Sequence, residues 1–160
     1  MPEEWIDAPA LKAVAGSLAA RFGEAILETT FEKKELAVRV RAEDVLPVLG
    51  HLKSELGFNA LDDMIGLDRF PPPGDERKRF AVLYQLYKFP EALRVRVAVD
   101  VGEGEAIPSI VGLYRSADWA EREIFDMFGL RFLGHPDLRR IYLPDEFAGH
   151  PLRKDFPLEG

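Results

Sequence analysis

Cysteine is absent from the 160 residues of this sequence, and histidine occurs only three times. Without cysteine the chain can form neither a disulfide nor a thiolate-ligated iron–sulfur cluster or zinc ribbon, and it has no thiol nucleophile. Basic residues are fewer than acidic ones, 21 against 28, so the formal net charge is −7. This acidic balance argues against nucleic acid as a partner.

Long apolar runs and nucleotide-binding loops are missing as well. No run approaches the roughly 20 residues that a membrane-spanning helix requires, and the acidic start of the chain, residues 1–4, is unlike a signal peptide. Gly102 and Gly104 lack the third glycine of a dinucleotide fingerprint, Glu103 and Glu105 would repel a pyrophosphate, and there is no Walker-type loop. These absences predict a soluble cytoplasmic protein without a nucleotide site of its own.

What the sequence does contain is an apolar fraction of 47%, enough for the core of one domain of ordinary size. Helical spacing of apolar residues predicts helices over 11–22 and 43–56. Alternating or continuous apolar runs predict strands over 25–31, 35–41, 61–70, 79–89 and 93–99. The first two are expected to form a hairpin around Lys33 and Lys34, and the apolar residues on both faces of 79–89 indicate a central strand. Because strands follow one another rather than alternating strictly with helices, we expect an α+β fold of two layers. One layer is a mostly antiparallel or mixed sheet of about five strands, and helices pack on it.

A third helix of about ten residues is predicted between Asp118 and Gly129. Asp118, with Glu121 three residues later, fits a capping box, and Gly129 suits the exit of the helix. A projection at about 100° per residue places Glu121 among apolar side chains. The side chains along one polar arc are then Trp119, Arg122, Glu123 and Asp126.

Three interpretations of these carboxylates stay open. In the first, Glu121 caps the helix, and Arg122 with Asp126 forms an i,i+4 ion pair on a solvated face. In the second, Glu121, Glu123 and Asp126 are held among aromatic side chains for contact with another subunit. The third is general acid–base catalysis, although no nucleophile or substrate cleft accompanies them.

The last 30 residues, 131–160, are called the strap here. Four prolines, at 136, 144, 151 and 157, exclude one long helix or an internal strand. The strap nevertheless carries too many apolar groups to leave in water, so we predict an extended segment docked on its own domain or on a partner, with residues 1–130 forming the α+β domain.

His135 and His150 with Asp137 or Asp155 form a conceivable metal site, but histidines in Gly-His-Pro turns are more often hydrogen-bonded hinges.

The order of residues across the third helix and the strap resembles the signature of the 30 kDa subunit family of respiratory complex I, which in bacteria is the C subunit of NADH-quinone oxidoreductase. The resemblance covers nearly the whole chain, and residues 107–157 make it specific. The residues that match the signature, and that we expect at a subunit interface, are Glu121, Arg122, Glu123, Asp126, Phe128, Gly129, His135, Pro136, Arg139, Arg140, His150, Pro151, Arg153, Lys154 and Asp155.

The resemblance implies a structural and assembly subunit of the peripheral arm, with no catalytic residue, cofactor or metal of its own. The enzyme as a whole would pass electrons from NADH through FMN and iron–sulfur clusters in partner subunits to quinone, coupled to proton translocation. The implied partners are chiefly the 49 kDa-type D subunit and also the B and I subunits, on the cytoplasmic side of the bacterial membrane. Since the chain ends at Gly160, it is expected to lack the extensions of longer family members.

Two alternatives remain beside this interpretation. Related subunits occur in plastoquinone-reducing complexes, in F420-linked dehydrogenases and in group 4 membrane-bound hydrogenases, and the signature does not separate them. A free-standing binding module is the other alternative, but it would leave the apolar groups of the strap without a partner surface. In either kind of complex we expect Arg139, Arg140, Arg153 and Lys154 to serve the partner interface rather than the internal fold.

Overall fold

The computed structural model describes residues 9–32 and 34–157. The acidic start at residues 1–4 and Lys33 of the expected first hairpin turn lie outside the described residues. The helices are α2 (Pro9–Phe22), α3 (Val45–Ser54) and α4 (Ala117–Phe128). The strands are β1 (Ile26–Glu32), β2 (Glu35–Val40), β3 (Ala60–Asp68), β4 (Phe80–Lys88), β5 (Leu93–Val101), β6 (Ala106–Pro108) and β7 (Arg131–Leu133).

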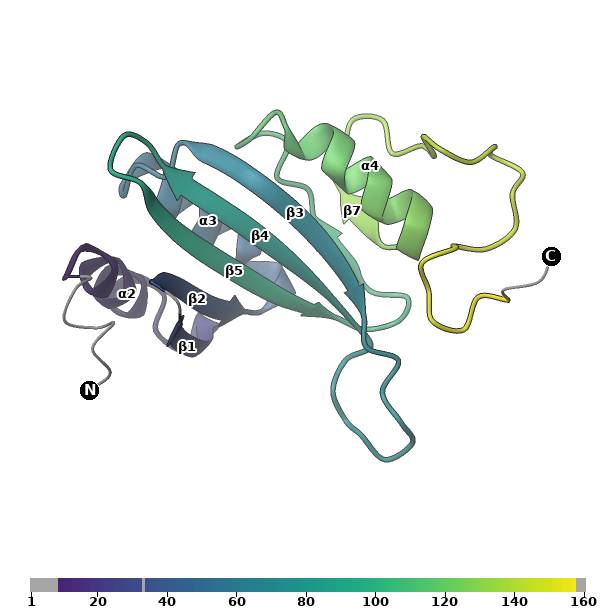
Figure 1. The fold of residues 1–160 in the computed structure, drawn as a ribbon, viewed down its shortest axis with the longest axis horizontal. Coiled ribbons are helices and arrows are strands. Elements are labelled where there is room, and N and C mark those ends of the chain that lie inside the picture. The colour runs from purple at the N-terminus through teal and green to yellow at the C-terminus, as the bar shows by residue number, and fades with distance from the viewer. Residues whose placement is uncertain (1–8, 33, 158–160) are drawn as a thin grey trace.

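Five of these strands form one mixed sheet in the order β1-β2-β5-β4-β3 (Figure 1). All neighbours in it are antiparallel except β2 and β5, which run parallel. The predicted hairpin of β1 and β2 is confirmed, and β4 is the internal strand that its continuous apolar pattern indicated. The expected α+β class and the mixed sheet of five strands are therefore confirmed.

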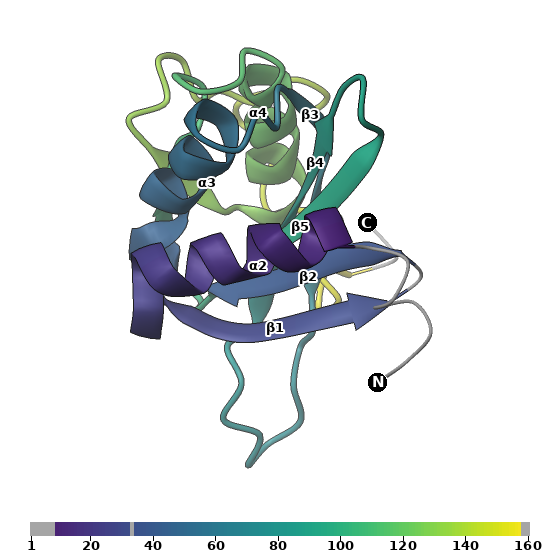
Figure 2. The same ribbon diagram turned by 90° about the vertical axis from the view of Figure 1, so that its left-hand side faces the viewer.

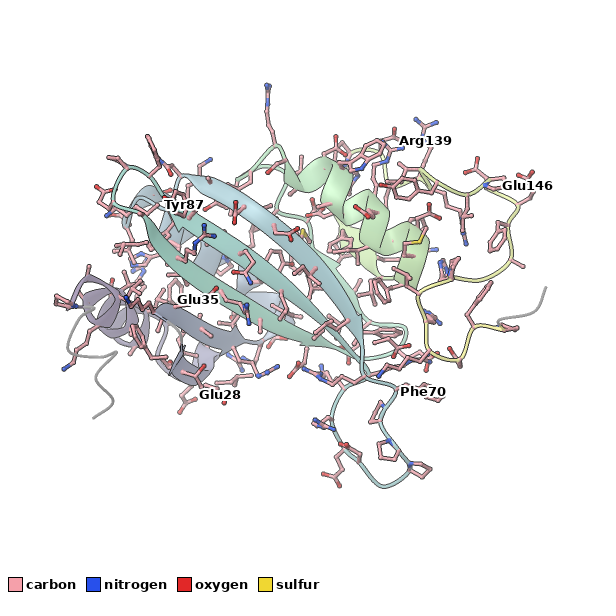
Figure 3. The ribbon with its side chains drawn as sticks, viewed as in Figure 1. Glu28, Glu35, Phe70, Tyr87, Arg139 and Glu146 are labelled. Atoms are coloured by element: carbon pink, nitrogen blue, oxygen red, sulfur yellow. The ribbon has the colours of Figure 1, made fainter. Side chains whose placement is uncertain are left out.

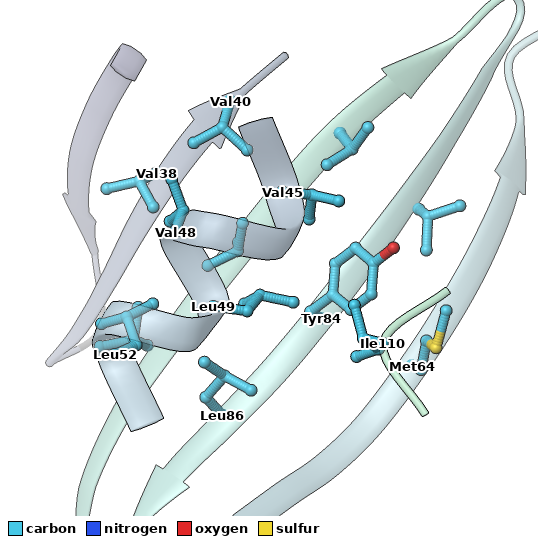
Figure 4. Packing of buried hydrophobic residues seen from close by; sticks show 14 of the residues in the cluster. Val38, Val40, Val45, Val48, Leu49, Leu52, Met64, Tyr84, Leu86 and Ile110 are labelled. Carbon is cyan, nitrogen blue, oxygen red and sulfur yellow. The ribbon is translucent and has the colours of Figure 1, made fainter. Parts of the chain in front are cut away.

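The helices cover one face of this sheet (Figure 2). Strand β2 alternates between buried and partly exposed residues, and its buried valines meet α3 in the core together with side chains of β4 (Figure 4). Helix α3 begins at Val45 after a 3₁₀ turn, Ala42–Asp44, so that Pro47 falls in the first turn, where a missing N–H is tolerated. Amphipathic burial, rather than capping, thus positions these elements.

Helix α4 lies against β3 on the same face of the sheet (Figure 2). Its approach is close at Gly66, where a Cβ atom would lie 2.9 Å from two ring carbons of Phe128 and 3.3 Å from Ile124. A side chain there would overpack the contact between helix and strand. Glycine at position 66 therefore allows α4 to rest directly on the backbone of β3.

A second, two-stranded sheet pairs β6 with β7 in parallel, and α4 is the crossover between them. The N–H of Ser109 also donates to the carbonyl of Leu133 at 2.7 Å. The first three residues of the strap are therefore part of this small sheet. From 134 to 157 the strap contains no helix or strand and runs around the C-terminal end of α4 (Figure 1).

Candidate functional site: helix α4 and the strap docked on it

The N-terminal end of α4 differs from the prediction. Ser116 occupies the N-cap position and Asp118 lies in the first turn, so Asp118 and Glu121 do not form a capping box. The predicted exit is confirmed, because Gly129 has a left-handed φ of 78° and its N–H donates to the carbonyl of Phe125 at 2.8 Å. The predicted capping box is wrong because a carboxylate that caps a helix and one that is buried, as Glu121 is, cannot be told apart by their side-chain chemistry.

Glu121 is fully buried, and its carboxylate accepts the N–H of Ile110 at 2.9 Å. This bond ties the loop after β6 to α4. Burial raises the pKa of Glu121, and hydrogen bonds from Ser109 and Ile110 only partly oppose the shift. The pKa of Tyr84, a buried neighbour in the core, is raised by burial and by the charge of Glu121. Enclosed in this way, Glu121 has no route to an external substrate or subunit.

Asp126 is the anchor of the strap. It is fully buried, and its Oδ2 atom accepts the N–H groups of Ile141, Tyr142 and Leu143 at 3.2, 2.8 and 3.3 Å. Its Oδ1 atom lies 3.1 Å from Nη1 of Arg140, and the two side chains are 0% and 9% exposed. Asp126 therefore makes neither the i,i+4 pair with Arg122 nor a contact with another subunit, because its own strap surrounds it.

The strap also satisfies the carbonyls that the end of α4 leaves free. A helix leaves its last four carbonyls without partners inside the helix. The carbonyl of Asp126 lies 2.9 Å from Nδ1 of His150, that of Met127 accepts the N–H of Leu152 at 3.0 Å, and that of Phe128 accepts Nε of Arg153 at 2.6 Å. The remaining carbonyl, that of Phe125, accepts the N–H of Gly129 at the end of the helix. The strap thus acts as the C-terminal cap of α4.

His150 completes this cap in its neutral form. Burial lowers the pKa of His150, and the nearby charges of Arg140 and Arg153 lower it further. The ring packs on Phe125 with centroids 6.2 Å apart, and a Cβ atom on Gly129 would lie 2.6 Å from it. Glycine is required at position 129 both by its φ and by this contact.

A second anchor holds the far end of the strap to the main sheet. Arg79 binds Asp68 through two bonds of 2.9 Å, and it reaches Asp155 at 2.7 Å. The N–H of Lys154 donates to Asp68 at 2.8 Å. Burial alone would raise the pKa of Asp68, but the hydrogen bonds from Arg79, Lys154 and Phe70 together lower it. No motif in the sequence singles out Asp68 or Arg79, because their partners in the strap lie 86 and 76 residues away along the chain.

The histidines are hinges of two separate turns. His135 accepts the N–H of Asp137 at Nδ1, at 2.9 Å, so its Nε2–H faces Asp118 of α4 with the Oδ1 atom 2.9 Å away. His150 lies at the opposite end of the same helix. Over residues 9–32 and 34–157, no three His, Asp or Glu side chains are grouped as metal ligands. None of the helices in those ranges is long and apolar enough to cross a membrane.

The structure therefore divides the residues that the sequence analysis proposed for an interface. Arg140 and Arg153 bind inside the fold, contrary to the expectation for them, because the carboxylate and carbonyls of α4 need donors. Arg139 remains 67% exposed and pairs with Asp137 beside it, and it points away from α4 (Figure 3). The proposed residues that stay exposed are Glu123, Pro136, Arg139, Lys154 and Asp155, although Asp155 is bonded to Arg79.

Known proteins resemble this chain along most of its length. Residues 38–160 match the family described as respiratory-chain NADH dehydrogenase, 30 Kd subunit. The C subunit of NADH-quinone oxidoreductase from Geotalea uraniireducens is 41% identical over 141 residues, which are 88% of this chain and 84% of that protein. The C subunit from Trichlorobacter lovleyi is 42% identical over 144 residues, 89% of this chain and 87% of that protein.

Solved structures agree with the sequence relatives. A trypsin-resistant fragment of Nqo5 superimposes with a TM-score of 0.70 at 33% identity, covering 81% of this chain and 99% of that one. A chain of an archaeal membrane-bound sulfane sulfur reductase has the same fold, with a TM-score of 0.77 at 19% identity over 92% of this chain and 86% of that one. The family match, the relatives and the shared fold lead to one conclusion: the chain belongs to the 30 kDa subunit family of respiratory NADH dehydrogenases.

Proposed function

We propose that the protein is a structural subunit of the peripheral arm of an NADH-quinone oxidoreductase, equivalent to its C subunit, without a redox centre of its own. One observation carries the proposal beyond family membership. The carboxylates and cations that a catalytic interpretation would need, Glu121, Asp126 and Arg140, are consumed in binding the chain to itself. What they build is a fixed, irregular strap that presents its outer side to another protein.

In this role the chain supplies surface rather than chemistry. Electrons would pass from NADH through FMN and iron–sulfur clusters held by other subunits to quinone, with proton translocation in the membrane part. The 49 kDa-type D subunit is the proposed main partner, with the B and I subunits beside it, on the cytoplasmic side of the membrane. The exposure of Tyr142 and Leu152 supports such a contact, because both are more than half exposed although the strap backbone beside them is anchored.

The test is affinity purification of the tagged full-length chain from its host in mild detergent, with identification of the copurifying proteins by mass. The expected result is stoichiometric recovery of the B, D and I subunits, and no flavin or iron in the chain when it is purified alone. A stoichiometric cofactor on the isolated chain would contradict the proposal. Recovery of hydrogenase subunits, or of those of an F420-linked or plastoquinone-reducing complex, would assign it to that related complex instead.

A further inference from the structure

Two aromatic side chains next to the strap anchor remain more than half exposed. Trp119 on α4 is 53% exposed and Tyr142 in the strap is 57% exposed. Their rings meet edge to face, with centroids 6.3 Å apart and an angle of 87°. Tryptophan and tyrosine bury large areas when they find a partner, so leaving both in water forgoes a sizeable stabilisation. This exposed Trp119–Tyr142 pair is unlike the buried Tyr84 and Tyr114.

The aromatic pair is also held rigidly. The backbone N–H of Tyr142 is fixed by Asp126 at 2.8 Å. The guanidinium of Arg122 lies 5.6 Å from the ring centroid of Trp119, and its Nε donates to the carbonyl of Arg139 at 3.3 Å. Binding to such a surface costs little conformational entropy, because the side chains are already in place. Tryptophan, tyrosine and arginine are the residue types that dominate the energetic centres of protein interfaces.

A groove beside Trp119 defines what the surface receives. It lies between α4 and β3 and holds about 160 Å³, room for one side chain but less than the roughly 300–1,000 Å³ of small-molecule sites. Its lining contains three carboxylates and no cation: Asp62, Asp63 and Glu123. Asp62 is paired with Arg94 at 2.8 Å. In the described part of the chain, Asp63 and Glu123 have no ion-pair partner, so the groove carries uncompensated negative charge next to an aromatic ring.

We infer that this groove is an interface centre that receives one basic side chain, lysine or arginine, of a partner protein. The cation would lie beside the exposed part of Trp119 and pair with Glu123 and Asp63, which gives these two carboxylates the ion-pair partner that the fold does not supply. The inference rests on the proposed function only in taking the partner to belong to the same complex. It deepens that function by naming where the partner binds and which charge it brings.

A photocrosslinking experiment on the full-length chain in its host tests the inference. A benzophenone amino acid replaces Glu123, or, as the control, Glu91 in the exposed turn between β4 and β5, which does not line the groove (Figure 1). After irradiation of intact membranes, position 123 is expected to crosslink to one partner peptide that contains lysine or arginine, and position 91 is not. Absence of a protein crosslink from position 123 in an assembled complex would overturn the inference.

Charge reversal gives a second readout. Glu123→Lys is expected to lower the amount of chain recovered with its partners at least about ten-fold, and Trp119→Ala to act in the same direction, whereas Glu91→Lys leaves it unchanged. Each isolated variant must keep the wild-type melting temperature, which separates a binding defect from misfolding. Wild-type recovery of both Glu123→Lys and Trp119→Ala would refute the inference while leaving the proposed function standing. A basic peptide of an unrelated protein crosslinked at position 123, with no oxidoreductase subunit recovered, would refute the proposed function and support the inference.

Discussion

Replacing Asp126 with asparagine should release the strap while leaving the main sheet folded. The substitution keeps the shape of the side chain but removes its charge, and turns one acceptor into an NH₂ donor. That donor would face either Arg140 or the three N–H groups of residues 141–143. The core around α3 and the five-stranded sheet does not depend on these bonds. The effect should therefore be local opening rather than global unfolding.

The magnitude follows from the burial of the pair. Breaking a buried ion pair by neutralising one partner costs about 3–5 kcal/mol, and Asp126 and Arg140 are 0% and 9% exposed. Asparagine still accepts one set of hydrogen bonds, and Arg140 keeps its bond of 2.6 Å to the carbonyl of Gly149, so we take the lower end, about 3 kcal/mol. A change of about 1.4 kcal/mol is ten-fold in an equilibrium constant. The open state of the strap should therefore become about 100-fold more populated.

Limited trypsin digestion measures this population directly. The strap contains cleavage sites after Arg139, Arg140, Arg153 and Lys154. The rate at which the C-terminal fragments appear by mass should rise about 100-fold in Asp126→Asn, since cleavage of a transiently open segment tracks its population. Glu123→Gln, one turn away on the exposed side of α4, is the matched control and should digest like the wild type. A digestion rate of Asp126→Asn within about three-fold of the wild type would refute this role of the anchor, because three-fold corresponds to only about 0.7 kcal/mol in the free energy of opening. Unfolding of the whole domain would refute it as well.

Three further substitutions probe the same region. Burial raises the pKa of Glu121 above its ordinary 4.5, so its contribution to stability is fully present below that pH and is lost as the pH rises through the folded pKa. Glu121→Gln should flatten this fall in melting temperature with rising pH, and parallel curves for the two proteins would contradict it. Gly129→Ala should lower the free energy of unfolding in urea by at least about 2 kcal/mol through its left-handed φ and overpacking, whereas Gly112→Ala, with open space around it, should not. Arg79→Lys loses the bidentate bond to Asp68, and a melting temperature lower by about 5 °C is expected; an unchanged value would show that the pair is dispensable.

The main sheet could be predicted because its strands carry their burial pattern locally. In β2, Leu36, Val38 and Val40 point into the core while their neighbours do not, and period two is visible within six residues. The parallel pairing of β2 with β5 could not be predicted in this way. The residues of a strand show which face is buried, but they do not show which other strand lies beside it. The short strands β6 and β7 were missed for a similar reason. Each has only three residues, and they pair across an intervening helix.

The interior roles of the charged residues were missed for a different physical reason. A carboxylate that caps a helix, one that faces water and one that anchors a distant segment have the same chemistry. The choice depends on which N–H groups the fold brings near. Glu121 serves Ile110, eleven residues earlier, and Asp126 serves residues 141–143 further along the chain. Their position on the helix is evident from the sequence, but their partners are not.

One requirement at the end of α4 could nevertheless have been stated in advance. Any helix that ends at Gly129 leaves four carbonyls to be satisfied, and the segment that follows is rich in donors and unable to form a helix of its own. His150 and Arg153 meet that requirement, and Arg140 meets the charge of Asp126. A basic residue in an irregular tail is therefore not by itself a sign of an interface, because the free carbonyls and carboxylates of the preceding helix can bind it instead. A charged side chain without an internal partner, such as Glu123 among the described residues, is therefore the one to test at an interface.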